Sequence, residues 1–179
     1  MKSKNTIRVS LTAMFAAIYA VGVVFIAPIS FQIFQVRLAD ALLPLAMLFG
    51  WPAVLGLSLG AFVANFFGGL GPVDMIGGSI ANFLATFGAW QIVRNRGKRW
   101  ALVGVGVEVL VISLIVGPYL SYLLAMPLGV SLLGIFLGSL VAIGILGSLL
   151  FFALSRQRIV SLVTSHELAD GGALQEKKP

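Results

Sequence analysis

Six stretches of mostly apolar residues follow one another along this chain, separated by short polar, glycine-rich or basic segments. A helix that crosses a bilayer needs about 20 largely apolar residues. None of the stretches shows the strict alternation of a membrane β-barrel strand. They cover approximately residues 7–27, 38–49, 53–67, 74–93, 100–126 and 129–154. The pattern predicts an all-α, polytopic membrane protein built as a bundle of six transmembrane helices.

The composition leads to the same class. Of the 179 residues, 59% are hydrophobic and 10% are charged, and the mean hydropathy is +1.05. Soluble domains carry about a quarter charged residues. A water-soluble enzyme and a nucleic-acid-binding domain are therefore excluded. A disulfide-stapled secreted module is excluded too, because the chain has no cysteine.

The basic residues indicate the orientation of the bundle. Nine of them fall at the start, in the loop between the fourth and fifth runs, and after the sixth run. They are Lys2, Lys4, Arg8, Arg94, Arg96, Lys98, Arg99, Arg156 and Arg158. With six spans these three regions lie on one side, which the positive-inside rule assigns to the cytoplasm. We therefore expect cytoplasmic termini, with a transmembrane domain over residues 1–158 and a polar cytoplasmic tail over 159–179.

Polar side chains gather toward the outer ends of the predicted helices. Ionisable residues inside a membrane are costly, so each is a candidate for function. The amides and tyrosines near the same helix ends add hydrogen-bonding and stacking groups. The candidate binding residues are Arg37, Asp40, Asn65, Asp74, Ser79, Asn82, Glu108, Tyr119 and Tyr122. The topology predicts that they share one depth and line a pocket open to the outside.

Each candidate also has a purely structural explanation. Arg37 and Asp40, three residues apart, can form an ion pair at a helix start. Asp74 follows a proline and can cap a helix, the amides can hydrogen-bond between helices, and the tyrosines can belong to an aromatic interface belt. Glu108 differs, because it is about 12 Å deep by helical rise and no basic partner for it lies in any span. Three roles fit Glu108: it is protonated, it lines the floor of the pocket, or it contacts a partner protein.

Catalytic groups are scarce in this sequence. The single histidine, His166, lies in the predicted tail, so the spans hold no histidine or cysteine for hydrolysis or metal binding. There is no Walker motif for ATP hydrolysis, and the two halves of the chain do not repeat each other. We therefore expect no enzyme activity, catalytic residue, metal or cofactor.

Small residues four apart occur in three of the predicted helices. Such spacing lets helix backbones approach closely. The glycine pairs Gly56–Gly60 and Gly134–Gly138 favour packing within the bundle. The overlapping alanine pairs Ala13–Ala17 and Ala16–Ala20 fit either internal packing or a partner protein.

Several segments resemble the QueT family, whose members are substrate-binding membrane subunits (S-components) of energy-coupling factor (ECF) transporters associated with queuosine precursors. The resemblance covers about residues 7–155 and is strongest over 35–90. Asp40 stands where many relatives have glutamate, and Ser139 where they have an acidic residue. The segments are QVRLADALLP at 35–44, GAFVAN at 60–65, GLGPVD at 69–74, GGSIAN at 77–82 and VEV at 107–109.

The resemblance implies a six-helix multi-pass protein in a prokaryotic cell membrane. It implies that Ala13 and Ala17 dock on a transmembrane coupling subunit, which two cytoplasmic ATPases drive. It also implies that the substrate is a 7-deazaguanine such as preQ0, preQ1 or queuine. An S-component for another vitamin-like solute, and a non-transporting membrane assembly protein, are the alternatives.

Overall fold

The computed structural model describes residues 2–25 and 37–156, and every regular element in this part is helical. The elements are α1 (Lys2–Phe25), η1 (Leu38–Leu45), α3 (Ala46–Phe49), α4 (Trp51–Gly68), α5 (Pro72–Arg96), η2 (Lys98–Trp100), α6 (Ala101–Leu123), α7 (Leu128–Ser139), η3 (Leu140–Gly147) and α8 (Ser148–Ser155). The predicted all-α, polytopic architecture is therefore confirmed. The tail predicted over 159–179 lies outside the described residues.

Five of the helical segments are long and apolar enough to cross a membrane, and the sixth is shorter. The last span is continuous from α7 through a π-helical segment, η3, to α8. The short sixth segment, Leu38–Phe49, consists of a 3₁₀ helix and one α-helical turn. Because a 3₁₀ helix rises about 2.0 Å per residue, this segment extends over about 22 Å instead of the 18 Å of an ideal α-helix.

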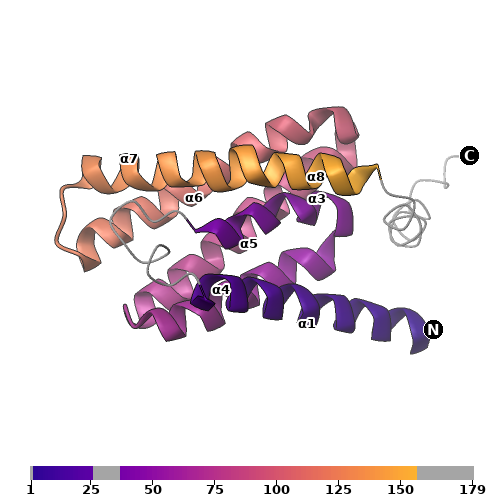
Figure 1. The fold of residues 1–179 in the computed structure, drawn as a ribbon, viewed down its shortest axis with the longest axis horizontal. Helices are drawn as coiled ribbons and strands as arrows, with labels where there is room; N and C mark the ends of the chain where they lie inside the picture. Colours follow the sequence, from indigo (N-terminus) through magenta and orange to yellow (C-terminus); the bar gives the residue numbers. More distant parts are fainter. Residues whose placement is uncertain (1, 26–36, 157–179) are drawn as a thin grey trace, which may run out of the picture.

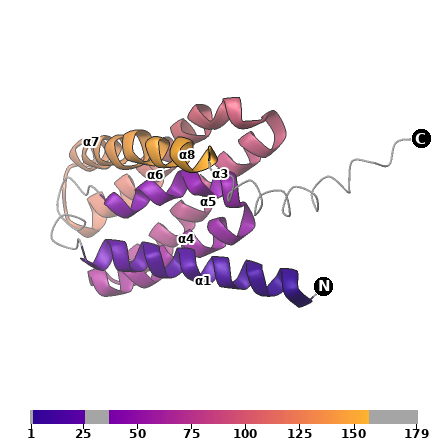
Figure 2. The ribbon, with the colours of Figure 1, turned by 45° about the vertical axis from the view of Figure 1, so that its right-hand side comes forward.

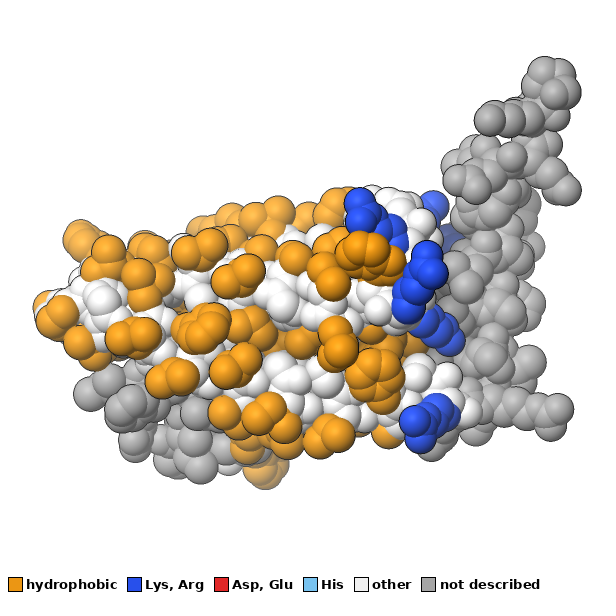
Figure 3. Space-filling model, turned by 90° about the horizontal axis from the view of Figure 1, so that it is seen from above, with side chains coloured by type: hydrophobic (Ala, Val, Ile, Leu, Met, Phe, Trp, Pro, Cys, Tyr) orange, Lys and Arg blue, Asp and Glu red, His pale blue; other side chains and the backbone are white. Residues whose placement is uncertain are grey.

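Both described ends of the chain lie at the same end of the molecule. The start of α1 and the end of α8 point the same way in Figures 1 and 2. The lysine and arginine side chains visible in the space-filling view gather at one end, while hydrophobic side chains cover the body (Figure 3). The positive-inside rule assigns this basic end to the cytoplasm.

Close backbone contact joins α1 to α4. A Cβ atom added at Gly56 would lie 2.6 Å from the backbone oxygen of Thr12, and one added at Gly60 would lie 2.8 Å from that of Ala16. No larger side chain fits at either position without a shift of α1. The predicted internal packing role of these two glycines is confirmed, and Gly134 and Gly138 are likewise buried in α7.

The two alanine pairs of α1 lie in different environments. Ala13 and Ala17 are exposed on the surface, whereas Ala16 and Ala20 are half-buried. The distinction follows from the α4 contact, because Ala16 lies directly against Gly60. Ala13 and Ala17 thus belong to a face of α1 that no described element of the chain covers.

Candidate functional site

Four polar residues from four elements form a hydrogen-bonded group that we name the outer cluster: Arg37, Asn65, Asp74 and Tyr119. The Arg37 guanidinium, at the start of η1, donates to the Asn65 side-chain oxygen. The Asn65 amide, on α4, donates to the backbone oxygen of Asp74 at 2.7 Å. The Tyr119 hydroxyl, on α6, donates to the Asp74 carboxylate at 3.1 Å. The cluster therefore connects η1, α4, α5 and α6 at one point.

Asp74 owes its position to the beginning of α5. Gly71 is the N-cap residue, Pro72 follows at the first helical position, and no side-chain capping bond is formed there. Asp74 in the first turn is favoured by the partial positive charge of the helix N-terminus. Its carboxylate contacts Tyr119 instead of acting as the N-cap, so the capping explanation does not hold.

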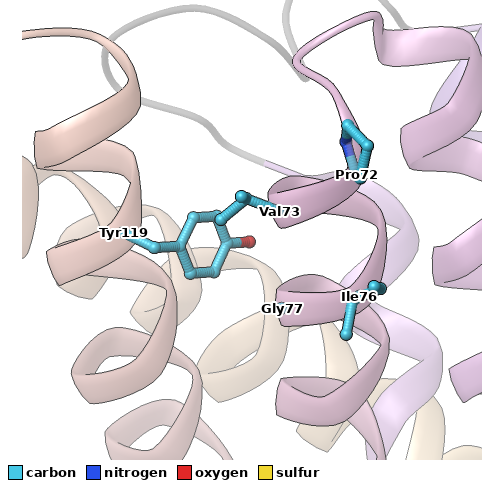
Figure 4. A pocket seen from close by; sticks show the side chains of 5 residues that line it. All are labelled: Pro72, Val73, Ile76, Gly77 and Tyr119. Atoms are coloured by element: carbon cyan, nitrogen blue, oxygen red, sulfur yellow. The ribbon is translucent and has the colours of Figure 1, made fainter.

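Two consecutive glycines on α5 make room for the outer cluster. A Cβ atom at Gly78 would lie 2.3 Å from the Asn65 amide nitrogen, and one at Gly77 would lie 2.9 Å from the Tyr119 ring. Figure 4 shows the Tyr119 ring beside Val73 and Gly77. Sequence reasoning did not identify these glycines as part of the site. Their adjacency within a predicted helix, where glycine is unfavourable, was the available signal.

A second group, the inner cluster, contains Tyr19, Asp40, Asn82 and Glu108. The Tyr19 hydroxyl donates to the Asp40 carboxylate at 2.5 Å and also interacts with the Asn82 side chain. The Asn82 amide donates to the backbone oxygen of Leu57 at 3.3 Å. Tyr19 was not among the predicted residues, although it is the one tyrosine of the first apolar run.

Glu108 is the least compensated member of the inner cluster. Its side chain is fully buried, and neither carboxylate oxygen has a hydrogen-bond partner among the described residues. The charged residue that acts on it electrostatically is Asp40, another carboxylate. One oxygen of Asp74, Oδ2, also has no partner in the described part of the chain. Three buried acceptor atoms are therefore left without a donor.

The two clusters lie at different depths, so the prediction of a single depth is wrong. Asp74 and Asn82 are both on α5 and are eight residues apart, which corresponds to about 12 Å along a helix. Arg37 interacts electrostatically with Asp40 and with Asp74, so it connects the inner cluster with the outer one.

The polar side chains are covered in the structure. Arg37, Asp40, Asn65, Asp74 and Asn82 are all buried, which differs from the open pocket expected from the sequence. A surface hollow of about 400 Å³ lies next to the outer cluster, and Tyr119 forms part of its wall (Figure 4). The other residues lining it are Pro72, Val73, Ile76 and Gly77.

Two of the predicted residues lie outside both clusters. Ser79 faces α4, where Ser58 donates to its backbone oxygen at 2.8 Å, so Ser79 belongs to the contact between α4 and α5. Tyr122 is 83% exposed, which does not fit a pocket residue and agrees with the interface-belt explanation. Its neighbour Tyr119, three residues earlier, points inward.

The chemistry of the two clusters is that of polar recognition. They offer carboxylate oxygens as acceptors, together with amides, tyrosine hydroxyls and one guanidinium. No group of three histidine, cysteine, aspartate or glutamate side chains in the described ranges is arranged to hold a metal ion.

Comparison with known proteins adds one finding. A family model described as QueT transporter matches residues 9–156 of this chain. No curated protein and no solved structure gave a match. The matched range includes every residue of both clusters and extends from the first described helix to the last. The chain therefore belongs to the QueT transporter family.

Proposed function

We propose that this protein is the substrate-binding membrane subunit of an ECF importer and that it takes up a queuosine precursor of the 7-deazaguanine class. Membership of a transporter family supports a role in transport rather than in catalysis. The observation that carries the choice of ligand is the set of three buried carboxylate oxygens without a donor, on Asp74 and Glu108. A ligand rich in N–H donors satisfies them.

A 7-deazaguanine presents a guanine-like edge with adjacent N–H donors and a neighbouring carbonyl. A carboxylate accepts two adjacent N–H groups at once, and an amide or guanidinium donates to the carbonyl. Aromatic side chains add stacking to a flat ring. Asp74, Arg37, Asn65 and Tyr119 provide this combination in the outer cluster.

The route into the site passes Tyr119 in this proposal. Tyr119 lines the surface hollow, its ring lies against Gly77, and its hydroxyl donates to Asp74 at 3.1 Å. A hydrogen bond to a charged group contributes about 1.5–3 kcal/mol. We expect the ring to rotate when the ligand binds, because contacts with the ligand replace this bond.

Equilibrium binding tests the proposed ligand class. Purified, detergent-solubilised protein is titrated with 7-cyano-7-deazaguanine, its aminomethyl form and queuine, with guanine and riboflavin as controls. Selective binding of a deazaguanine supports the proposal. If well-folded protein binds none of them, the ligand class is wrong, and an S-component for another solute or a membrane assembly role takes its place.

Two substitutions test the site itself. Asp40→Asn keeps an oxygen that accepts from Tyr19. Asn82→Ala removes a long hydrogen bond of 3.3 Å and an interaction with Tyr19, which keeps its bond to Asp40. Both variants should therefore stay folded. We expect each to weaken binding about tenfold or more, which is 1.4 kcal/mol or more. Ser113→Ala is the matched control, because Ser113 is buried and its side chain donates to the backbone oxygen of Val109 in its own helix. Unchanged affinity in both variants would show that the inner cluster is not part of the binding site.

We further propose that Ala13 and Ala17 form the surface that docks on the transmembrane coupling subunit of an ECF module with two cytoplasmic ATPases. The support is that both alanines are exposed on α1 while the alternative pair, Ala16 and Ala20, is half-buried and Ala16 packs against α4. Small side chains on an exposed face allow close approach of a second helix.

Co-purification with the coupling subunit and the ATPases tests this surface. Ala13→Leu together with Ala17→Leu should abolish co-purification and leave ligand binding unchanged, because the clusters lie on other faces. Ala153→Leu, at an exposed alanine of α8, is the matched control and should retain the complex. An intact complex in the double variant contradicts the docking proposal and leaves the proposed ligand class unaffected.

A further inference from the structure

We propose that the ligand carries a protonated amine and that Glu108 is the carboxylate that receives it. The inference rests on the proposed function, because it specifies which 7-deazaguanines the protein takes. It assigns a cationic side arm, as in an aminomethyl group, to the inner cluster and the flat ring to the outer cluster.

The charges of the two clusters do not balance. They contain three carboxylic acids, Asp40, Asp74 and Glu108, and one guanidinium, Arg37, and all four side chains are buried. An uncompensated charge in such surroundings is strongly unfavourable. A ligand with a positive charge reduces this imbalance when it binds, whereas a neutral ligand leaves it unchanged.

Glu108 is the carboxylate that a bound cationic group would stabilise most. Asp40 accepts from Tyr19, and Asp74 accepts from Tyr119. Arg37 acts electrostatically on both aspartates. Glu108 has neither type of support among the described residues: both its oxygens lack a hydrogen-bond partner, and its electrostatic neighbour is Asp40.

An ammonium group fits this environment better than a metal ion does. It brings three N–H donors, which can serve both oxygens of Glu108 and one more acceptor nearby. A metal ion needs several protein ligands, and no set of three suitable side chains comes together in residues 2–25 and 37–156. The depth of Glu108 then places the amine on the arm that points inward.

A pair of ligands with the same ring isolates the charge of the arm. Binding of 7-aminomethyl-7-deazaguanine and of 7-cyano-7-deazaguanine is measured on the unmodified protein, on Glu108→Gln and on Ser113→Ala. We expect the unmodified protein to prefer the aminomethyl ligand at least tenfold. Glu108→Gln should lose that preference through weaker binding of the amine, with the nitrile changed less than about threefold, and Ser113→Ala should keep it.

Equal binding of the two ligands, or an unchanged preference in Glu108→Gln, overturns this inference and leaves the proposed function standing. The second result would mean that Glu108 acts as a neutral acid, since glutamine reproduces its shape without charge. Binding of neither ligand to folded protein instead overturns the proposed function.

The N-acetylated aminomethyl ligand tests the same point without any change to the protein. Acetylation removes the positive charge of the amine, so we expect its affinity to fall to the level of the nitrile. An acetylated ligand that binds as tightly as the free amine contradicts the proposal even if Glu108→Gln does not fold.

Discussion

Gly78 connects the sequence of α5 directly with the geometry of the outer cluster. The Asn65 side chain reaches across the surface of α5 at this point to bond the backbone oxygen of Asp74 and to accept from Arg37. It can do so only because Gly78 has no side chain. One missing methyl group therefore determines whether three residues of the candidate site come together.

Gly78→Ala should displace Asn65, because the new Cβ would lie 2.3 Å from its amide nitrogen. We expect ligand affinity to fall at least tenfold and the protein to lose about 1–3 kcal/mol of stability through overpacking. Ligand titration and thermal unfolding in detergent measure the two effects.

Gly106→Ala on α6 is the matched control, since nothing lies within 4 Å of the added carbon. Alanine is a better helix former than glycine, so this variant should be as stable as the unmodified protein or slightly more so. A Gly78→Ala variant that behaves like Gly106→Ala would show that Asn65 does not depend on the glycine.

Sequence reasoning identified most of the polar residues of the site but not their separation into two depths or the direction that each faces around its helix. Asp40, Glu108 and Tyr119 were predicted for the site and lie in the two clusters. Tyr122 was predicted with Tyr119 because residues three apart are neighbours on a helix, yet Tyr122 is exposed. A three-residue step rotates the side chain by about 60°, which is enough at the edge of the bundle to change from the interior to the surface.

The hydrogen-bond partners of the charged residues, and the glycines that leave room for other side chains, were harder to predict than the charged residues themselves. Tyr19 becomes part of the site through its bond to Asp40, which is 21 positions away in the sequence. Gly77 and Gly78 matter because of atoms on other helices. These relations depend on how the helices are rotated against one another, and the apolar pattern of each helix alone does not define that rotation.

At the scale of elements, the two segments that depart from α-helical geometry pack against each other. η1 contains Pro44, and η3 is the π-helical part of the last span. Gly147, at the end of η3, lies so close to Pro44 that an added Cβ atom would be 2.8 Å from the proline ring. The six apolar runs were predictable, but hydropathy contains no information on 3₁₀ or π geometry.

Gly147→Ala should force η1 and η3 apart, because the proline ring is rigid and cannot rotate away. We expect a loss of about 1–3 kcal/mol in stability, measured as a lower thermal midpoint in detergent. Gly129→Ala, in the same span but with nothing within 4 Å of the added carbon, should leave the midpoint unchanged. Equal thermal midpoints for the two variants would show that the close contact between Gly147 and Pro44 does not limit the stability of the protein.

At the scale of the whole molecule, one end carries the basic side chains and the other carries the site. The outer cluster lies near the start of α5, and α5 ends in Arg94 and Arg96. The orientation deduced from the positive residues therefore predicts that the outer cluster lies on the non-cytoplasmic side, which is the side required by the import function that we propose.

Single cysteines test this orientation directly, because the natural chain has none to interfere. Ala125→Cys, in the exposed turn after α6, should react with a membrane-impermeant maleimide on intact cells. Lys98→Cys, in the basic segment between α5 and α6, should react only after permeabilisation. The opposite labelling pattern would reverse the membrane orientation and with it the side on which the site opens.

The short segment Leu38–Phe49 has a consequence for how the protein is made. Among the described helices it is shorter than the five that are long enough to cross a membrane, and the charged residues Arg37 and Asp40 at its start disfavour membrane insertion. Arg37 has Asp40 as a charged neighbour within three residues, but its hydrogen-bond partner Asn65 is 28 residues further along the chain. We therefore expect this segment to reach its final position only after α4 has been synthesised. Insertion of Leu38–Phe49 would then depend on a helix that follows it in the sequence.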